Sequence, residues 1–214
     1  MMNSLINDLI KNGDLKSDLV IDAFSDISRI EFVPVELELQ AEKNISLPVG
    51  FGRLITKPET TAFILEMLDP QIGQKILVIE SGSGWEATML ALIVGRTGRV
   101  VAIDRNNEIV KFSENNANKF SFIKDGTLSF FCADEMDGYA FEAPYDRILV
   151  LAEHYEVPQK FKDQLKVGGK LVMAVKSSLV YVEKKSETEF SEEEFAGFHF
   201  PALSPENYTV IKNI

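Results

Sequence analysis

A glycine-rich segment is the part of the sequence whose residue types point most directly to chemistry. It runs from Glu80 to Gly84 (E-S-G-S-G), between the apolar residues 76–79 and an apolar stretch that begins at Trp85. Backbone amides at the N-terminus of a helix can hold an anionic or polar ligand group, and glycine lets that ligand approach the main chain closely. The order of strand, glycine-rich turn and helix therefore predicts a ligand site built largely from main-chain atoms.

An acidic residue, Asp104, makes the expected ligand more specific. It comes twenty residues after Gly84, at the end of the next expected strand. A carboxylate at that place can accept hydrogen bonds from both hydroxyls of a ribose. Together, the turn and the acid indicate an adenosine-containing ligand.

The same glycines also fit a dinucleotide-binding pattern. Gly82, Gly84 and Ala87 satisfy G-x-G-x-x-A, so a nicotinamide cofactor stays open as an alternative. However, about 75 residues of helix and loop precede the first strand, and an expected hairpin closes the sheet where a second nucleotide-binding half would be needed. These features favour a methyl donor over nicotinamide.

The glycine-rich turn must be positioned by the elements that precede it in the chain. These are two helical stretches, a long irregular segment and a third helix. Apolar residues recur at helical spacing over residues 5–10 and 19–27. Periodicity is lost over residues 29–56, and segments of that length without regular structure are usually functional or disordered. Pro58 suits the first position of a helix, where its missing N–H costs nothing.

From residue 75 onward, short apolar runs alternate with helical patterns. The expected strands are residues 75–79, 99–103, 128–132, 147–151 and 170–175, and the expected helices are residues 85–94, 108–120 and 158–165. Such alternation predicts an α/β fold, a mostly parallel sheet with helices on both faces. Residues 171–175 and 179–183 flank a turn and predict an antiparallel C-terminal hairpin, and alternation over residues 197–200 suggests a last strand.

Composition excludes several classes of partner. The formal net charge of −11 argues against nucleic acid, which is bound largely through clustered Lys and Arg. The longest apolar runs fall far short of the ~20 residues that cross a membrane. Residues 1–16 mix polar residues into the apolar positions and do not fit a secretory signal, so we expect a cytoplasmic protein that is a monomer or weak homodimer.

Cysteine, histidine and the acidic residues add three local expectations. Two histidines and one cysteine are too sparse for an obvious metal cluster, so no metal site is expected. Cys132 lies in an apolar run and is expected to be a buried, inert thiol. Residues 183–194 are rich in Glu and are expected to form a solvated loop.

Short motifs occur in a fixed order along the chain. In the N-terminal part, residues 29–34 fit R-x-x-F-V-P and residues 47–58 fit most of L-P-I-G-x-G-Q-T-I-S-x-P. In the middle of the chain, residues 81–84 resemble T-G-S-G, Asp104 and Arg105 match an acid followed by Arg, and Asp134 matches the Asp of G-D-G. Further on, residues 143–146 resemble A-P-F-D, residues 164–175 resemble Q-L-K-P-G-G-R-L-V-x-P-V, and residues 198–203 resemble F-V-P-L. In this order they resemble the protein-L-isoaspartate O-methyltransferases. The resemblance implies a Rossmann-like methyltransferase fold in one domain, residues 1–214, with N-terminal helices and a substrate-covering loop in residues 1–57 and a donor-binding core in residues 58–214.

The resemblance also implies a reaction. A methyl group would pass from S-adenosyl-L-methionine, leaving S-adenosyl-L-homocysteine, to the free carboxylate of an isoaspartyl residue in a damaged protein or peptide. A carboxylate with a pKa near ~4 is already an anionic nucleophile at neutral pH, so no general base is needed. Proximity and orientation are then the main catalytic effects, and Thr56 would hydrogen-bond the acceptor carboxylate.

Residue by residue, the resemblance assigns two sets of contacts. The cofactor-binding set is Glu80, Ser81, Gly82, Ser83, Gly84, Trp85, Asp104, Arg105, Asp134 and Glu135. The substrate-binding set is Leu47, Pro48, Val49, Gly50, Arg53 and Ile55. Within the first set, Asp104 would bind the ribose and Asp134 the adenine amino group.

Two departures from the family pattern fall in the donor loop. Val78 and Glu80 stand where the family has an acid and a glycine. Glu80 either restores the missing carboxylate or fills the donor pocket, and a buried unpaired charge there would need a cation, hydrogen bonds or solvent beside it. A catalytically impaired member that binds a protein or peptide is therefore an alternative function.

Other departures concern the acceptor. Arg53 replaces a Gln and could bind a carboxylate through its forked donors. Glu153, His154 and Lys176 also replace smaller residues. A methyltransferase with a different carboxylate acceptor is thus a further alternative, although we expect His154 to be a solvated loop residue.

Overall fold

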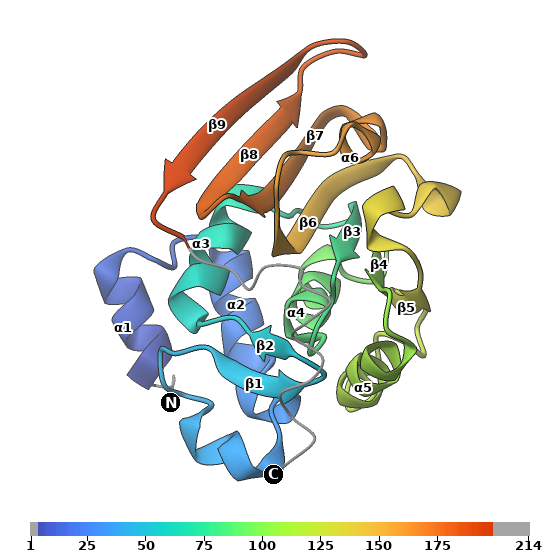
Figure 1. Cartoon of the computed structure of the whole chain (residues 1–214). Coiled ribbons are helices and arrows are strands. Elements are labelled where there is room, and N and C mark those ends of the chain that lie inside the picture. Colours follow the sequence, from blue (N-terminus) through green and yellow to red (C-terminus); the bar gives the residue numbers. More distant parts are fainter. Residues whose placement is uncertain (1–3, 199–214) are drawn as a thin grey trace.

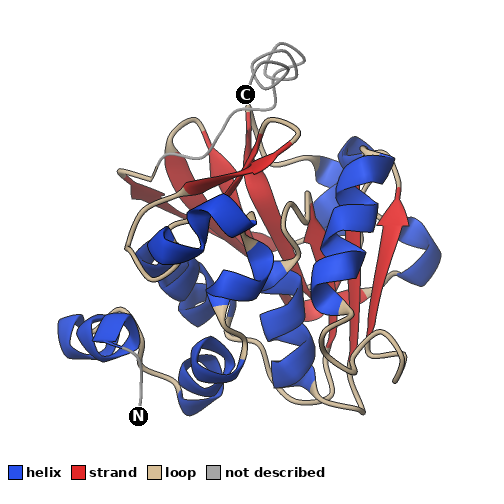
Figure 2. Ribbon diagram, turned by 90° about the horizontal axis from the view of Figure 1, so that it is seen from below, coloured by secondary structure: helices blue, strands red, loops and turns tan. Residues whose placement is uncertain are grey.

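A seven-stranded sheet with helices on both faces forms the body of the protein (Figures 1 and 2). The structure, a computed structural model, describes residues 4–198. The strand order is β5-β4-β3-β6-β7-β8-β9. The strands are β3 (Lys75–Ile79), β4 (Arg99–Asp104), β5 (Leu128–Cys132), β6 (Tyr145–His154), β7 (Leu165–Val175), β8 (Ser178–Lys184) and β9 (Phe190–Ala196). The first five in this order are parallel, and β8 and β9 are antiparallel additions at one edge.

Within residues 4–198, six α-helices pack around the sheet. They are α1 (Ser4–Asn12), α2 (Asp18–Asp26), α3 (Pro58–Leu68), α4 (Trp85–Val94), α5 (Asn107–Ala117) and α6 (Gln159–Asp163). Pro58 begins α3 as expected, and Asp69 ends that helix in the left-handed conformation. The side chain of Asn106 caps α5 by accepting a hydrogen bond from the Glu108 amide at 2.8 Å.

The core has two parts because successive strand residues point to opposite faces of the sheet. On β3, Ile76 and Val78 join the apolar cluster beneath α1 to α5, whereas Leu77 and Ile79 join a second cluster with Phe161 of α6. The continuous apolar run of β3 is therefore explained by burial on both faces. The expected α/β fold, the parallel sheet and its antiparallel edge are confirmed.

Residues 29–56 are more ordered than the loss of periodicity predicted. They contain the 3₁₀ helices η1 (Arg29–Phe32) and η2 (Val35–Gln40) and the strands β1 (Leu47–Gly50) and β2 (Arg53–Ile55). Strands β1 and β2 form a two-stranded hairpin separate from the main sheet (Figure 1, light blue). The expected loop is thus a short hairpin attached to 3₁₀ turns.

The acidic stretch is not the solvated loop that the sequence predicted. Strand β9 pairs with β8 over seven residues, from Phe190 opposite Lys184 to Ala196 opposite Ser178. Glu is a poor strand former, but charged residues on an edge strand prevent pairing with other chains. The alternation at residues 197–200 does not mark this strand, since Gly197 and Phe198 follow β9, and residues 199–214 lie outside the described part of the chain.

The environment of Cys132 differs from the one that the sequence predicted. Cys132 is exposed, not buried, because it is the last residue of the edge strand β5, and its thiol donates to the carbonyl of Arg105 at 3.4 Å. No helix within residues 4–198 is long and apolar enough to cross a membrane. The same residues hold no group of three or more His, Cys, Asp or Glu side chains arranged for a metal ion.

Candidate active site

The glycine-rich turn follows β3 and leads into α4. The Ser81 amide donates to the carbonyl of Ile103 at 3.0 Å, which ties the turn to β4. Gly84 has φ +84°, and a Cβ there would lie 3.1 Å from the Cβ of Ser113 and 3.3 Å from the ring of Phe130. Glycine is therefore required at position 84 both by its backbone conformation and by the close approach of α5.

Helix α5 also fixes the direction of the turn's peptide groups. The Ser113 hydroxyl donates to the carbonyl of Gly82 at 2.7 Å, and the side-chain amide of Asn116 donates to the carbonyl of Ser83 at 3.0 Å. Because the carbonyl and N–H of one planar peptide point in opposite directions, the amides of Ser83 and Gly84 point away from α5. The turn is thus held rigidly from behind by two buried polar side chains.

Three buried acids converge beyond the ends of β3, β4 and β5. Glu80 follows β3, Asp104 ends β4 and Glu135 lies in the 3₁₀ helix η3 (Glu135–Asp137), and each is at most 3% exposed. Nη2 of Arg53 lies 3.3 Å from Oδ1 and 3.4 Å from Oδ2 of Asp104, and 4.0 Å from Oε2 of Glu135. Nε of Arg105 lies 3.1 Å from Oε1 of Glu135. Two arginines therefore neutralise this acidic cluster.

Glu80 is the member of the cluster with the least support from the chain. It has φ +62°, and among the described residues neither of its buried carboxyl oxygens has a hydrogen-bond partner as an acceptor. Burial, and next the charge of Glu135, raise the pKa of Glu80 well above its ordinary value. In its protonated form Glu80 can donate a hydrogen bond to Glu135.

Thr56 lies directly after β2, beside a fourth buried acid, Glu86, that sequence reasoning missed. The Thr56 carbonyl accepts a hydrogen bond from Arg29 at 2.9 Å, and its hydroxyl interacts with the carboxyl group of Glu86. Glu86 also accepts a hydrogen bond from Thr61 at 3.1 Å, and burial raises its pKa. One signal could have revealed this residue, because Glu86 is the only charged residue in the otherwise apolar and hydroxyl-bearing α4.

The donor turn and Thr56 line one small cavity. Arg53, Glu80 and Ser81 lie around it together with Gly82, and its volume is about 20 Å³. Sites for small molecules usually measure ~300–1,000 Å³. In this structure the hairpin, through Arg53, closes the space in front of the glycine-rich turn.

Comparison with known proteins agrees with the motif order. The sequence profile of the family described as protein-L-isoaspartate(D-aspartate) O-methyltransferase matches residues 1–206. The chain belongs to this family. A protein-L-isoaspartate O-methyltransferase of Methanopyrus kandleri is 36% identical over 209 residues, covering 95% of this chain and 92% of the relative. A protein-L-isoaspartate O-methyltransferase of Staphylothermus marinus is 38% identical over 176 residues, covering 80% of this chain and 77% of the relative.

Solved structures show the same fold. A putative protein-L-isoaspartate O-methyltransferase from Plasmodium falciparum, in complex with S-adenosyl-L-homocysteine, superposes with a TM-score of 0.84. It is 20% identical, and the match covers 94% of this chain and 97% of that one. The Rossmann-like methyltransferase fold expected from the family resemblance is therefore confirmed.

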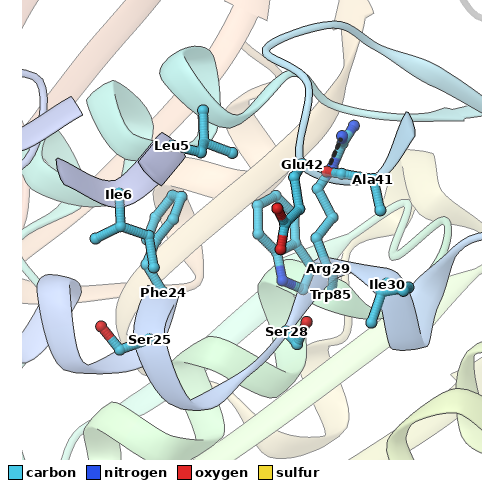
Figure 3. A pocket seen from close by; sticks show the side chains of 10 residues that line it. All are labelled: Leu5, Ile6, Phe24, Ser25, Ser28, Arg29, Ile30, Ala41, Glu42 and Trp85. Carbon is cyan, nitrogen blue, oxygen red and sulfur yellow. Dashed lines mark hydrogen bonds between the residues drawn. The ribbon is translucent and has the colours of Figure 1, made fainter. Parts of the chain in front are cut away.

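Trp85, which the family pattern assigns to the donor, packs toward the N-terminal helices. Its Nε1 donates to the carbonyl of Ile27 at 2.9 Å, and its ring meets Phe24 edge-on at 5.4 Å between centroids. Figure 3 shows the indole beside Arg29, whose guanidinium carbon lies 5.5 Å from the ring centre. Phe24, Arg29 and Trp85 line a separate pocket of about 400 Å³, and a contact between Trp85 and the donor stays a prediction.

The family's adenine residue lies at the edge of another pocket. Asp134 is exposed and caps η3 by accepting from the Met136 amide at 3.0 Å. It lines a pocket of about 680 Å³ with Tyr139 and Phe141. Its neighbour Glu135 is buried in the acidic cluster. Asp134 and Glu135, which were both predicted to bind the donor, therefore lie in different surroundings.

Several of the residues predicted to bind the acceptor anchor the β1–β2 hairpin to the core. Leu47, Val49 and Ile55 are buried in the apolar core, whereas Pro48 is exposed. Among the predicted acceptor set, Arg53 is the residue that lines the cavity. Contacts of the other hairpin residues with an acceptor stay predictions.

His154 is not the solvated loop residue that we expected. Strand β6 continues to His154, which pairs with Val175 and is 7% exposed. Its ring meets Phe161 edge-on at 5.8 Å, and burial lowers its pKa. This environment indicates that the His154 side chain is neutral and contributes to packing.

Proposed function

We propose that this protein is an active S-adenosylmethionine-dependent methyltransferase that esterifies the free carboxylate of L-isoaspartyl residues in damaged proteins or peptides. Family membership and the names of its relatives support the reaction class. The observation that carries the proposal for this chain is that Thr56 and the glycine-rich turn line the same cavity. A donor group on the turn and an acceptor at Thr56 would therefore face each other.

The polar groups around the cavity fit the donor. Both carboxyl oxygens of Glu80 and the hydroxyl of Ser81 are buried, and none of these three oxygens accepts a hydrogen bond from the described residues. Buried polar atoms of this kind are costly unless a ligand satisfies them. A Cβ at Gly82 would find its nearest neighbour 3.8 Å away, so the turn leaves room for a ligand to approach the main chain. Asp104 offers both carboxylate oxygens to a ribose once Arg53 has moved.

The chain's own residues then have limited tasks. When bound, S-adenosylmethionine supplies a methyl group on a positively charged sulfur. Thr56 would orient the acceptor carboxylate by donating its hydroxyl hydrogen. In this structure the Thr56 hydroxyl donates to the carboxyl group of Glu86, so it would turn from Glu86 to the acceptor when the substrate binds. The hairpin would exclude water from the reacting groups.

A catalytically impaired, protein-binding member of the family is the second candidate. The cavity of about 20 Å³ and the buried side chain of Glu80 favour it. Calorimetric titration separates the two functions, because an impaired member would not bind S-adenosylhomocysteine at any micromolar concentration.

Transfer of a radiolabelled methyl group to an isoaspartyl peptide tests the proposal. We expect transfer by the wild type, a rate on the order of 10²-fold lower for Thr56→Ala, and substantial recovery for Thr56→Ser, because one positioned donor is lost and then restored. Arg96→Gln is a matched surface control, since the Arg96 side chain is 86% exposed. Equal rates for the wild type and Thr56→Ala would contradict the role of Thr56.

A further inference from the structure

Arg53 occupies the position where the donor and acceptor sites meet. It begins β2, three residues before Thr56, and its side chain is 14% exposed. Gly50 is its partner across the hairpin. The side chain therefore extends from the hairpin toward Asp104, at the end of a strand of the main sheet.

The pairing of Arg53 with Asp104 is incompatible with ribose binding. Nη2 of Arg53 is within 3.4 Å of both carboxylate oxygens of Asp104. Those oxygens are the atoms that would accept hydrogen bonds from the two ribose hydroxyls. With a cavity of only about 20 Å³ in front of the turn, Arg53 must leave Asp104 before a nucleoside can enter.

The described residues offer the displaced guanidinium no equally good partner. Glu135 lies 4.0 Å from Nη2 of Arg53 and is already paired with Arg105 at 3.1 Å. Burial favours the neutral form of Glu80. Nε of Arg53 is itself buried and has no hydrogen-bond partner within residues 4–198. A buried cation in this state is costly unless an anion replaces Asp104.

We propose that Arg53 is a specificity-determining residue that exchanges partners, pairing with Asp104 while the donor site is closed and with the carboxylate of the acceptor once a ribose has taken Asp104. This inference rests on the proposed function. The planar fork of Arg can bind a carboxylate through two parallel hydrogen bonds, and Arg53 lines the same cavity as Thr56. A single side chain would thus couple donor binding to acceptor recognition.

The exchange predicts opposite effects of one substitution on the two ligands. In Arg53→Gln, S-adenosylhomocysteine should bind about fivefold or more tightly by calorimetry, because its competitor for Asp104 is gone. The KM for an isoaspartyl peptide should rise about tenfold with little change in kcat, because the acceptor loses its cation. Arg53→Lys, which keeps the charge without the fork, should give intermediate values for both constants.

The controls separate this inference from the proposed function. Arg96→Gln should change neither constant, and circular dichroism with thermal unfolding establishes that each variant is folded. If the wild type is active but Arg53→Gln binds S-adenosylhomocysteine less tightly, or leaves the peptide KM unchanged, the inference is overturned and the function stands. If the wild type transfers no methyl group to any isoaspartyl peptide, the function fails, and the inference with it.

Discussion

Arg29 holds the main chain of Thr56 in place, because its Nη2 atom donates a hydrogen bond to the Thr56 carbonyl at 2.9 Å. The same guanidinium also donates to the carbonyls of Ala41 at 3.0 Å, Ile45 at 2.9 Å and Ile55 at 3.3 Å. It is 5% exposed. One buried cation therefore joins η1 to both sides of the hairpin that carries the candidate catalytic residue.

Replacing Arg29 should weaken the fold and the site together. Arg29→Lys keeps a charge but cannot reach several carbonyls at once, so we expect the free energy of unfolding to fall by about 2–4 kcal/mol and methyl transfer to slow. Urea denaturation measures the first effect. Arg96→Lys should change neither, and an Arg29→Lys protein as stable as the wild type would show that the carbonyl bonds are dispensable.

The two glycines of the turn should differ in their response to alanine. Both have positive φ, but a Cβ at Gly84 would meet Ser113 and Phe130 at 3.1–3.3 Å, whereas a Cβ at Gly82 would find only the carbonyl of Glu80, at 3.8 Å. We expect Gly84→Ala to cost about 2–4 kcal/mol and Gly82→Ala about 1 kcal/mol. Thermal unfolding of both variants measures the difference, and equal losses would contradict the close packing of α5 on Gly84.

Glu80 should make the protein less stable as the pH rises. The pKa of Glu80 is raised in the folded state above its ordinary 4.5, so the unfolded chain loses this proton first. Stability linked to the proton is fully present below pH 4.5 and declines until the folded-state pKa is reached. Glu135, Asp104 and Arg53 face Glu80, and the raised pKa of Glu135 acts in the same direction.

The neutral isostere Glu80→Gln tests this linkage. Denaturant unfolding at pH 7 should show a higher free energy of unfolding for Glu80→Gln than for the wild type, because the variant has no ionisation to suppress. The two proteins should converge at pH 4. A wild type that gains stability relative to the variant between pH 4 and pH 7 would show that Glu80 is ionised and well paired in the folded state.

Much of the fold was predictable because it depends on local sequence patterns. Residues 75–79, 85–94 and 128–132 form β3, α4 and β5 with the bounds that the sequence predicted. Strands β6 and β7 extend beyond the predicted residues, since their polar ends are stabilised by pairing with each other. Strand β9 depends on its ladder with β8 and not on the strand propensity of its Glu-rich sequence.

The site was predictable in its residue types but not in its pairings. The turn and Asp104 were recognisable from spacing, whereas the pair of Arg53 with Asp104 joins residues 51 positions apart. The contact of Glu86 with Thr56 likewise depends on where the hairpin lies against α4. Contacts of this kind are set by tertiary packing, which periodicity and propensity do not encode.

Glu86 should contribute through hydrogen bonds and not through charge. Glu86→Gln can still accept from Thr61 and should retain stability at neutral pH. Glu86→Leu would leave the buried Thr61 hydroxyl without that partner, and we expect a loss of about 1–3 kcal/mol by urea denaturation. If Glu86→Gln were as damaging as Glu86→Leu, the carboxylate charge would be the essential feature.

The most direct test of the proposed activity compares two peptides of identical sequence, one with an L-isoaspartyl residue and one with the ordinary aspartyl residue at the same position. Each is incubated with the wild-type protein and S-adenosylmethionine, and base-labile methyl ester is measured by mass spectrometry. The proposed function predicts ester on the isoaspartyl peptide, little on its aspartyl counterpart, and strong reduction by Thr56→Ala. Absence of ester on the isoaspartyl peptide, or equal ester on both peptides, would contradict it.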